Sequence, residues 1–198
     1  MEKSRSEARI PQSIAESIAV KRAILDNPDF LSRIRQAADI ITASLRSGGK
    51  VHFCGNGGSA ADAQHLAAEL SGRYGFDRPP LNAEALHCNT SYLTAVANDY
   101  GYEAAFARLL QGTAKEGDVL VAISTSGNSR NILNAIEMSK TMGVKVIAMT
   151  GESGGAMRDR ADILLNVPSA DTPRIQECHI LIGHILSELV ENEIFTGQ

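Results

Sequence analysis

Two short segments rich in glycine and serine each follow a run of apolar residues and open a segment with helical spacing. They read CGNGGS at residues 54–59 and STSGNS at residues 124–129. Glycine permits tight turns and a close approach of the backbone to a ligand, and backbone N–H groups at the start of a helix favour an anion. Because two such loops occur in only 198 residues, the pattern predicts parallel strands that hold a phosphorylated small molecule at their carboxyl ends.

The remaining pattern predicts strands that alternate with helices. Short apolar runs between helical segments are typical of buried parallel strands with helices on both faces, so we expect an α/β fold. Two helices precede the first strand, and we expect residues 1–48 to form an arm for subunit contacts and residues 49–198 to form the sheet domain. Helices are expected over residues 11–26, 28–45, 59–74, 91–97, 103–113, 129–142 and 173–195, and strands over residues 51–54, 81–86, 119–123, 144–149 and 163–167.

The composition narrows the possible partners and the compartment. The formal net charge is -4 and the sequence has no dense block of Lys and Arg, so a nucleic-acid ligand is not expected. Three scattered cysteines, an odd number, argue against a disulfide framework and for a reducing compartment. No segment reaches the ~20 apolar residues that cross a bilayer, and the polar N-terminus lacks a signal peptide. The sequence therefore predicts a cytoplasmic protein with no membrane partner.

Polar residues within two apolar helices are the candidates for chemistry. His65 and Glu69 are four residues apart and share one helix face, in a stretch rich in alanine and leucine that indicates a buried helix. His184 lies in an apolar stretch of the last helix, whereas His179 lies among more polar residues and is the weaker candidate. His65 and Glu69 could also be an ordinary exposed polar pair, and His184 could be an imidazole packed in the core. The dipeptide Asn98-Asp99, taken alone, indicates only a turn.

A carboxylate and an imidazole from different helices suit two kinds of site. They can act as base and acid in proton transfer. With a second histidine and a neutral oxygen donor they can hold a metal, since histidine and carboxylate suit zinc. The residues by themselves leave open whether Glu69 and His184 meet in space.

Four stretches together resemble the sugar-isomerase (SIS) domain and, within it, the phosphoheptose isomerase family. They are residues 54–74, 95–101, 117–132 and 174–185. The glycine–serine loops are common to SIS domains, and the combination of Glu69 with His184 is more specific. The resemblance covers nearly the whole chain. It implies an SIS-type three-layer α/β/α sandwich with a five-stranded parallel sheet, and a homotetramer with active sites at the subunit interfaces.

The resemblance also implies a reaction and a set of site residues. The reaction is the conversion of sedoheptulose 7-phosphate to D-glycero-D-manno-heptose 7-phosphate through a cis-enediol(ate), for the lipopolysaccharide core or for nucleotide-activated heptose. By position Glu69 is the base, His184 is the acid, and one zinc ion per subunit binds His65, Glu69, Gln176 and His184. The substrate would contact Asn56, Gly57, Gly58, Ser59, Glu69, Asn98, Asp99, Ser124, Thr125, Ser126, Ser129 and Gln176.

Two other functions fit parts of the same pattern. One is a non-catalytic SIS scaffold that binds the bacterial replication initiator, and the other is an isomerase of a different sugar phosphate. The scaffold relatives are not expected to keep both Glu69 and His184, so the presence of both favours the enzyme. Ala60-Ala61 and Thr172-Pro173 depart from the residues of some family members, which leaves the accepted sugar stereochemistry open.

Overall fold

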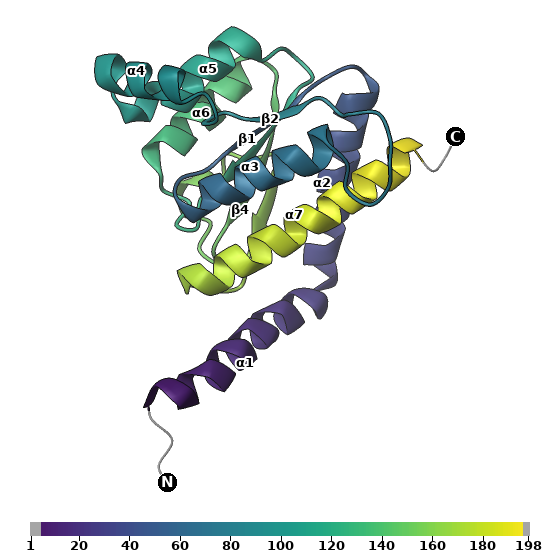
Figure 1. Ribbon diagram of the computed structural model, residues 1–198, viewed down its shortest axis with the longest axis vertical. Helices are drawn as coiled ribbons and strands as arrows, with labels where there is room; N and C mark the ends of the chain where they lie inside the picture. Colours follow the sequence, from purple (N-terminus) through teal and green to yellow (C-terminus); the bar gives the residue numbers. More distant parts are fainter. Residues whose placement is uncertain (1–4, 196–198) are drawn as a thin grey trace.

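The computed structural model, which describes residues 5–195, contains a five-stranded sheet (Figure 1). The strand order is β2-β1-β3-β4-β5, and each neighbouring pair is parallel. The predicted SIS-type sheet is thereby confirmed. The strands are β1 (Val51–Cys54), β2 (Ala83–Ala85), β3 (Val119–Ile123), β4 (Lys145–Thr150) and β5 (Ile163–Asn166).

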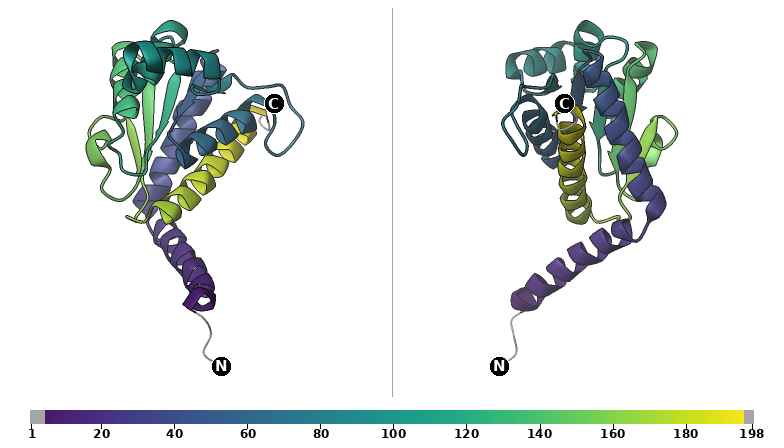
Figure 2. Two further views of the ribbon diagram at one scale, coloured as in Figure 1. Left: turned by 60° about the vertical axis from the view of Figure 1, so that its left-hand side comes forward. Right: turned by 90° about the vertical axis from the view of Figure 1, so that its right-hand side faces the viewer.

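Helices cover both faces of this sheet and complete three layers (Figure 2). One buried cluster joins α2, α3 and α7 to one face, and a second cluster joins α4, α5 and α6 to the other. Among the described residues, no helix combines the length and the apolar composition needed to cross a membrane. The helices are α1 (Arg5–Leu25), α2 (Pro28–Arg46), α3 (Gly58–Ser71), α4 (Thr90–Tyr100), α5 (Ala105–Thr113), α6 (Arg130–Thr141) and α7 (Thr172–Phe195), with short 3-10 turns at η1 (Tyr102–Ala104) and η2 (Gly155–Met157).

The central strand β3 shows why the apolar runs lack alternation. All five of its residues are buried. Val119, Val121 and Ile123 belong to the cluster with α2, α3 and α7, whereas Leu120 and Ala122 belong to the cluster with α5 and α6. A strand buried on both faces needs apolar side chains at every position, as parallel strands in α/β folds do.

Several helix ends differ from the sequence prediction. The helix α1 begins at Arg5 rather than at residue 11 and contains Pro11, although a proline in a helix interior removes one backbone hydrogen bond. The helix α3 ends at Ser71 rather than at residue 74, since Gly72 follows as its C-cap. The helix α4 continues to Tyr100, three residues beyond the prediction.

Of the two helices in the expected arm, only α1 projects from the body of the molecule (Figures 1 and 2). The helix α2 packs on the sheet through a buried face that includes Phe30, Ile34 and Ile41. Along α1, by contrast, large apolar side chains are more than half exposed: Ile10, Ile14, Ile18 and Leu25. The arm therefore carries an apolar stripe that this chain leaves uncovered within the described residues.

Candidate active site

The two glycine–serine loops lie side by side at the carboxyl edge of the sheet. The first follows β1 and the second follows β3, and these two strands are hydrogen-bonded neighbours. The chain passes from β1 to β2 on one side and then returns to β3 on the other side. The loops therefore flank the point where the strand order reverses, which is where open α/β sheets bind their ligands.

A pair of asparagine side chains joins the two loops. Asn56 in the first loop donates to Oδ1 of Asn131 at 2.9 Å, and Asn131 donates back to Oδ1 of Asn56 at 2.8 Å. The Tyr102 hydroxyl also donates to Oδ1 of Asn56 at 3.0 Å. Neither Asn131 nor Tyr102 was predicted to belong to the site, although Asn131 lies in the first turn of α6, two residues after the second loop. Their contacts fix the spacing of the two loops.

Both helices that start at these loops lack a side-chain cap, although some of their first N–H groups have other partners. The N–H groups of Ser59 and Ala60 donate to the carbonyls of Asn56 and Gly57, both at 3.0 Å, and Ile132 N donates to Oδ1 of Asn131 at 3.0 Å. Within the described chain, neither Gly57 before α3 nor Ser129 before α6 makes a side-chain capping bond, whereas Asn27 and Asn89 cap α2 and α4. The Ser129 hydroxyl instead lies 3.0 Å from the hydroxyl of the buried Ser124. A helix start that lacks a side-chain cap and lies next to serine hydroxyls is suited to bind an anion.

The second loop is held from behind by the glycine-rich turn at residues 151–157. Gly151 N donates to the carbonyl of Thr125 at 2.9 Å, and Met157 N donates to the carbonyl of Gly127 at 3.1 Å. Asn128 donates to the carbonyl of Ser126 at 3.0 Å and accepts from Ala156 N at 2.9 Å. A hollow opens between the two segments, lined by residues that include Thr125, Ser126, Gly151, Ser153 and Ser169.

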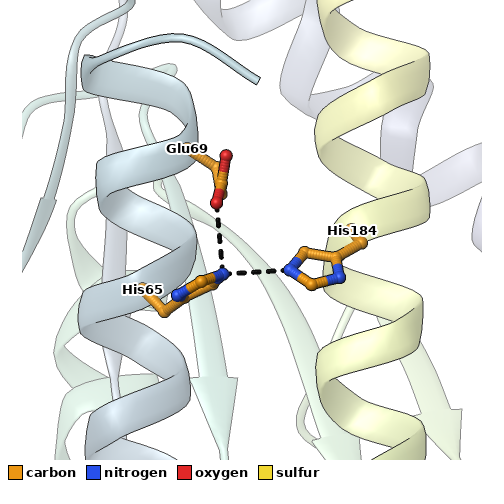
Figure 3. A group of neighbouring side chains, drawn as sticks. All are labelled: His65, Glu69 and His184. Atoms are coloured by element: carbon orange, nitrogen blue, oxygen red, sulfur yellow. Dashed lines mark hydrogen bonds and ion pairs between the residues drawn. The ribbon is translucent and has the colours of Figure 1, made fainter. Parts of the chain in front are cut away.

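Glu69 and His184, whose relative position the residues left open, meet in the folded chain through His65 (Figure 3). The Nε2 atom of His65 lies 3.1 Å from Oε1 of Glu69 and 3.0 Å from Nε2 of His184. Two helices supply the group, α3 and α7, which come close at Gly183, where a Cβ would lie 2.4 Å from the Leu66 side chain. The three side chains form the His–Glu–His cluster.

The surroundings of this cluster differ from the buried helix that was expected. The side chain of His65 is 51% exposed and that of Glu69 is 22% exposed, because only one face of α3 is buried, and Ala61 and Ala68 also lie on its exposed side. Two neighbours were missed by the sequence analysis. Burial raises the pKa of Asp62, one of whose carboxylate oxygens has no hydrogen-bond partner among the described residues. The ring of Tyr74 lies 5.9 Å from that of His184.

Three predicted site residues lie apart from the cluster. Gln176 lies against the first loop, since a Cβ on Gly58 would come within 2.5 Å of its amide nitrogen, and eight helical residues, or about 12 Å, separate it from His184. Asn98 and Asp99 are exposed at the end of α4 and bond to each other at 2.9 Å. In the described part of the chain, neither side chain bonds to the loops or to the cluster.

The donor chemistry of the His–Glu–His cluster fits a metal ion. Its two imidazole nitrogens and one carboxylate oxygen lie within 4.8 Å of one another. Zinc takes these ligand types, and three protein ligands leave a fourth position for water or substrate. The three side chains could therefore hold a metal.

His179 is the more buried of the two histidines of α7, although its sequence neighbours are more polar. Its side chain is fully buried, and its Nε2 atom lies 3.1 Å from the carbonyl oxygen of Thr150. Burial lowers the pKa of His179 to about 4. It is a core residue that ties α7 to the end of β4.

This histidine predicts acid sensitivity of the fold. Its pKa is lower in the folded protein than in the unfolded chain, so its contribution is complete above pH 6.5 and is lost as the pH falls toward 4. We expect a loss of up to ~3 kcal/mol in the free energy of unfolding over this window. Urea unfolding of the wild type and of His179→Gln, which cannot be protonated, would measure it. Equal pH dependence in both proteins would rule out His179 as the cause.

The parallel sheet, the paired loops at its switch point and the His–Glu–His cluster define an SIS-type α/β protein. A family model described as the SIS domain matches residues 16–151. The chain belongs to this family and, within it, to the phosphoheptose isomerases, as its relatives show. It is 57% identical over 192 residues to the phosphoheptose isomerase of Mycobacterium tuberculosis, covering 96% of this chain and 98% of the relative.

Further relatives agree with this membership. The phosphoheptose isomerase of Sulfurimonas denitrificans is 50% identical over 186 residues, which are 94% of this chain and 95% of the relative. Two solved phosphoheptose isomerase structures each cover 94% of this chain and are themselves covered to 98%. The one from Francisella tularensis has a TM-score of 0.90 at 40% identity, and the one from Neisseria gonorrhoeae has a TM-score of 0.88 at 41% identity.

Proposed function

We propose that this phosphosugar isomerase interconverts sedoheptulose 7-phosphate and D-glycero-D-manno-heptose 7-phosphate for heptose biosynthesis. One observation carries the proposal: His65 lies within hydrogen-bond distance of both Glu69 on α3 and His184 on α7, and α3 begins at the first glycine–serine loop. The names of the relatives agree with it.

The proposed chemistry moves two protons without a change of net charge. Glu69 takes a proton from C1 of the ketose while His184 gives one to the oxygen on C2, which forms a cis-enediol. His184 then takes the proton of the oxygen on C1, and Glu69 returns its proton to C2, which leaves the aldehyde. General acid and base catalysis of this kind contributes roughly 100-fold to 10,000-fold to the rate.

The loops have a separate role in this proposal. The phosphate is held by the N-termini of α3 and α6 and by the hydroxyls of Ser59, Ser124, Thr125, Ser126 and Ser129. Asn56, Gly57 and Gly58 line the site. Asn98, Asp99 and Gln176 would contact the sugar. The phosphate is remote from C1 and C2, so its binding energy positions the reacting carbons rather than entering the chemistry.

Incubation of the purified protein with sedoheptulose 7-phosphate in deuterated water tests the proposal. NMR should show an aldose product with deuterium at C2, because a carboxylate proton exchanges with solvent. Parallel samples with a chelator and with added zinc would show whether the metal is required. If the folded protein turned over nothing in any sample, another phosphosugar or a non-catalytic scaffold would become the better interpretation.

We further propose that the metal of the His–Glu–His cluster is zinc, with Gln176 as a fourth ligand. When bound, zinc would supply Lewis-acid polarisation of substrate oxygens. With four protein ligands this requires either a fifth coordination position or the release of Glu69, and a released Glu69 would be free to act as the base. The three clustered donors support zinc by their chemistry, and the distance from Gln176 to His184 implies either a movement of its side chain or a contribution from another subunit.

His65→Ala is expected to lower the bound zinc, since His65 lies between the other two donors. Elemental analysis of protein equilibrated with zinc and then desalted measures the stoichiometry. Cys88→Ala, which changes an exposed residue outside the cluster, is the control. An unchanged zinc content in His65→Ala would remove His65 from the ligand set.

We propose the homotetramer with active sites between subunits as the assembly of this chain. The uncovered apolar stripe of α1 and the half-exposed His65 are surfaces that another copy would cover. Within the N-terminal unit of residues 1–48, α1 would then serve as the arm, whereas α2 packs on the SIS domain of residues 49–198. Light scattering of the purified protein would give its mass in solution. A cytoplasmic location stays a prediction, which the three free cysteines favour.

A further inference from the structure

A buried ion pair lies two helical turns beyond His184. Nε of Arg78 is 2.8 Å from Oε2 of Glu191, and both side chains are only 2% exposed. Arg78 belongs to the segment between α3 and β2, and Glu191 belongs to α7. Burial of a charged pair costs desolvation energy that its mutual attraction often fails to recover. The pair therefore needs an explanation other than simple stabilisation.

The Arg78 guanidinium closes the C-terminal end of α3. It donates to the carbonyl oxygens of Glu69 at 2.9 Å, Leu70 at 2.8 Å and Gly72 at 2.9 Å. The last carbonyl groups of a helix lack partners within it, and a positive charge there is favourable. The last turn of α3 has no basic residue of its own. Arg78 thus binds the turn that carries the proposed base.

Glu191 holds the following residues of the chain to α7. Its carboxylate accepts from the backbone N–H of Tyr74 at 2.9 Å and of Gly75 at 2.6 Å. Burial alone would raise the pKa of Glu191, yet these two N–H groups and Arg78 hold it below its ordinary value, which keeps the carboxylate ionised. The Tyr74 backbone is therefore fixed where its ring lies beside His184.

We propose that Arg78 and Glu191 are positioning residues that hold α3 against α7 so that Glu69 and His184 face each other. The inference rests on the proposed function for the meaning of that geometry. Figure 3 shows Glu69 and His184 on two neighbouring helices. Arg78 binds the helix that carries Glu69, and Glu191 lies on the helix that carries His184. A guanidinium that makes several directed bonds fixes an orientation more sharply than apolar contacts do.

Glu191→Gln tests the proposal, with Glu193→Gln as the matched control. Glu193 lies two residues further along α7 and pairs with Arg35, but both of those side chains are at least 40% exposed. We expect Glu191→Gln to lower kcat at least tenfold and to shift the imidazole NMR signals of His65 and His184. Competitive inhibition by inorganic phosphate should stay within twofold, because the loops do not contact the pair. Glu193→Gln should change none of these.

A purely stabilising role predicts a different result. The melting temperature of Glu191→Gln would fall. At temperatures well below that melting temperature, however, its kcat and both of its imidazole signals would match those of Glu193→Gln. This outcome would overturn the proposal. If Glu191→Gln does not fold, Arg78→Lys is measured in the same way, since it keeps the charge but cannot reach the three carbonyl groups together. If the wild type itself is inactive, the proposed function fails, and the imidazole signals still decide the positioning role.

Discussion

Glu69→Gln is expected to lower kcat at least ~100-fold while the fold and phosphate binding remain intact, since general-base catalysis contributes roughly 100-fold to 10,000-fold. The amide nearly matches the carboxylate in shape, so the packing of α3 should be kept. It cannot take a proton from C1, however. Turnover of sedoheptulose 7-phosphate by NMR measures the loss, and circular dichroism checks the fold.

The control for this variant removes a carboxylate elsewhere. Glu137 on α6 pairs with Arg160 at an exposed position on the other side of the sheet, so Glu137→Gln should keep full activity. Zinc content measured with activity separates two roles of Glu69. Loss of activity with zinc retained supports the base, and activity restored by excess zinc supports a ligand alone. Substantial activity of Glu69→Gln without added zinc would reject Glu69 as the base.

Gly127→Ala is expected to destabilise the protein by about 2–4 kcal/mol and to weaken phosphate binding. Gly127 has φ +66°, and a Cβ there would lie 2.1 Å from the carbonyl oxygen of Gly154. The new methyl group would push the turn at residues 151–157 away from the second loop. Urea unfolding and titration with inorganic phosphate measure the two effects.

Gly112→Ala is the matched control for the second prediction. Gly112 lies within α5, has nothing within 4 Å of its would-be Cβ, and has no positive φ. Alanine is favoured over glycine in a helix by about 0.5–1 kcal/mol, so this variant should be slightly more stable than the wild type. If Gly127→Ala unfolded at the wild-type urea midpoint, the close packing of the turn at residues 151–157 against the second loop would not be what fixes the conformation of that loop.

Local signals in the sequence identified most of the architecture. The apolar run at residues 119–123 coincides with β3, because a strand buried on both faces requires apolar residues throughout. The glycine–serine loops were placed correctly at the strand ends, since glycine marks a tight turn whatever surrounds it. Helix ends were less certain, as Pro11 and Gly72 show, because an end depends on contacts that can override a local preference.

Only part of the candidate site could be predicted from local signals in the sequence. The four-residue spacing of His65 and Glu69 predicted a shared face, and they are in contact. The same apolar neighbours wrongly indicated burial for this pair. His179, the weaker candidate by its polar neighbours, lies in the core and outside the cluster, although those neighbours gave no sign of its burial. Exposure depends on which elements pack over a residue, and a stretch of sequence describes only one of them.

The amino-acid sequence by itself determined the alternation of strands and helices, the two loops and the family to which this chain belongs, because these depend on residues close together in the chain. The tertiary structure decided that His184, 115 residues after Glu69, meets it through His65. It also decided that Asn131 joins the two loops and that Arg78 and Glu191 hold α3 against α7. Such contacts depend on how helices pack across the sheet, and no spacing along the chain encodes that packing.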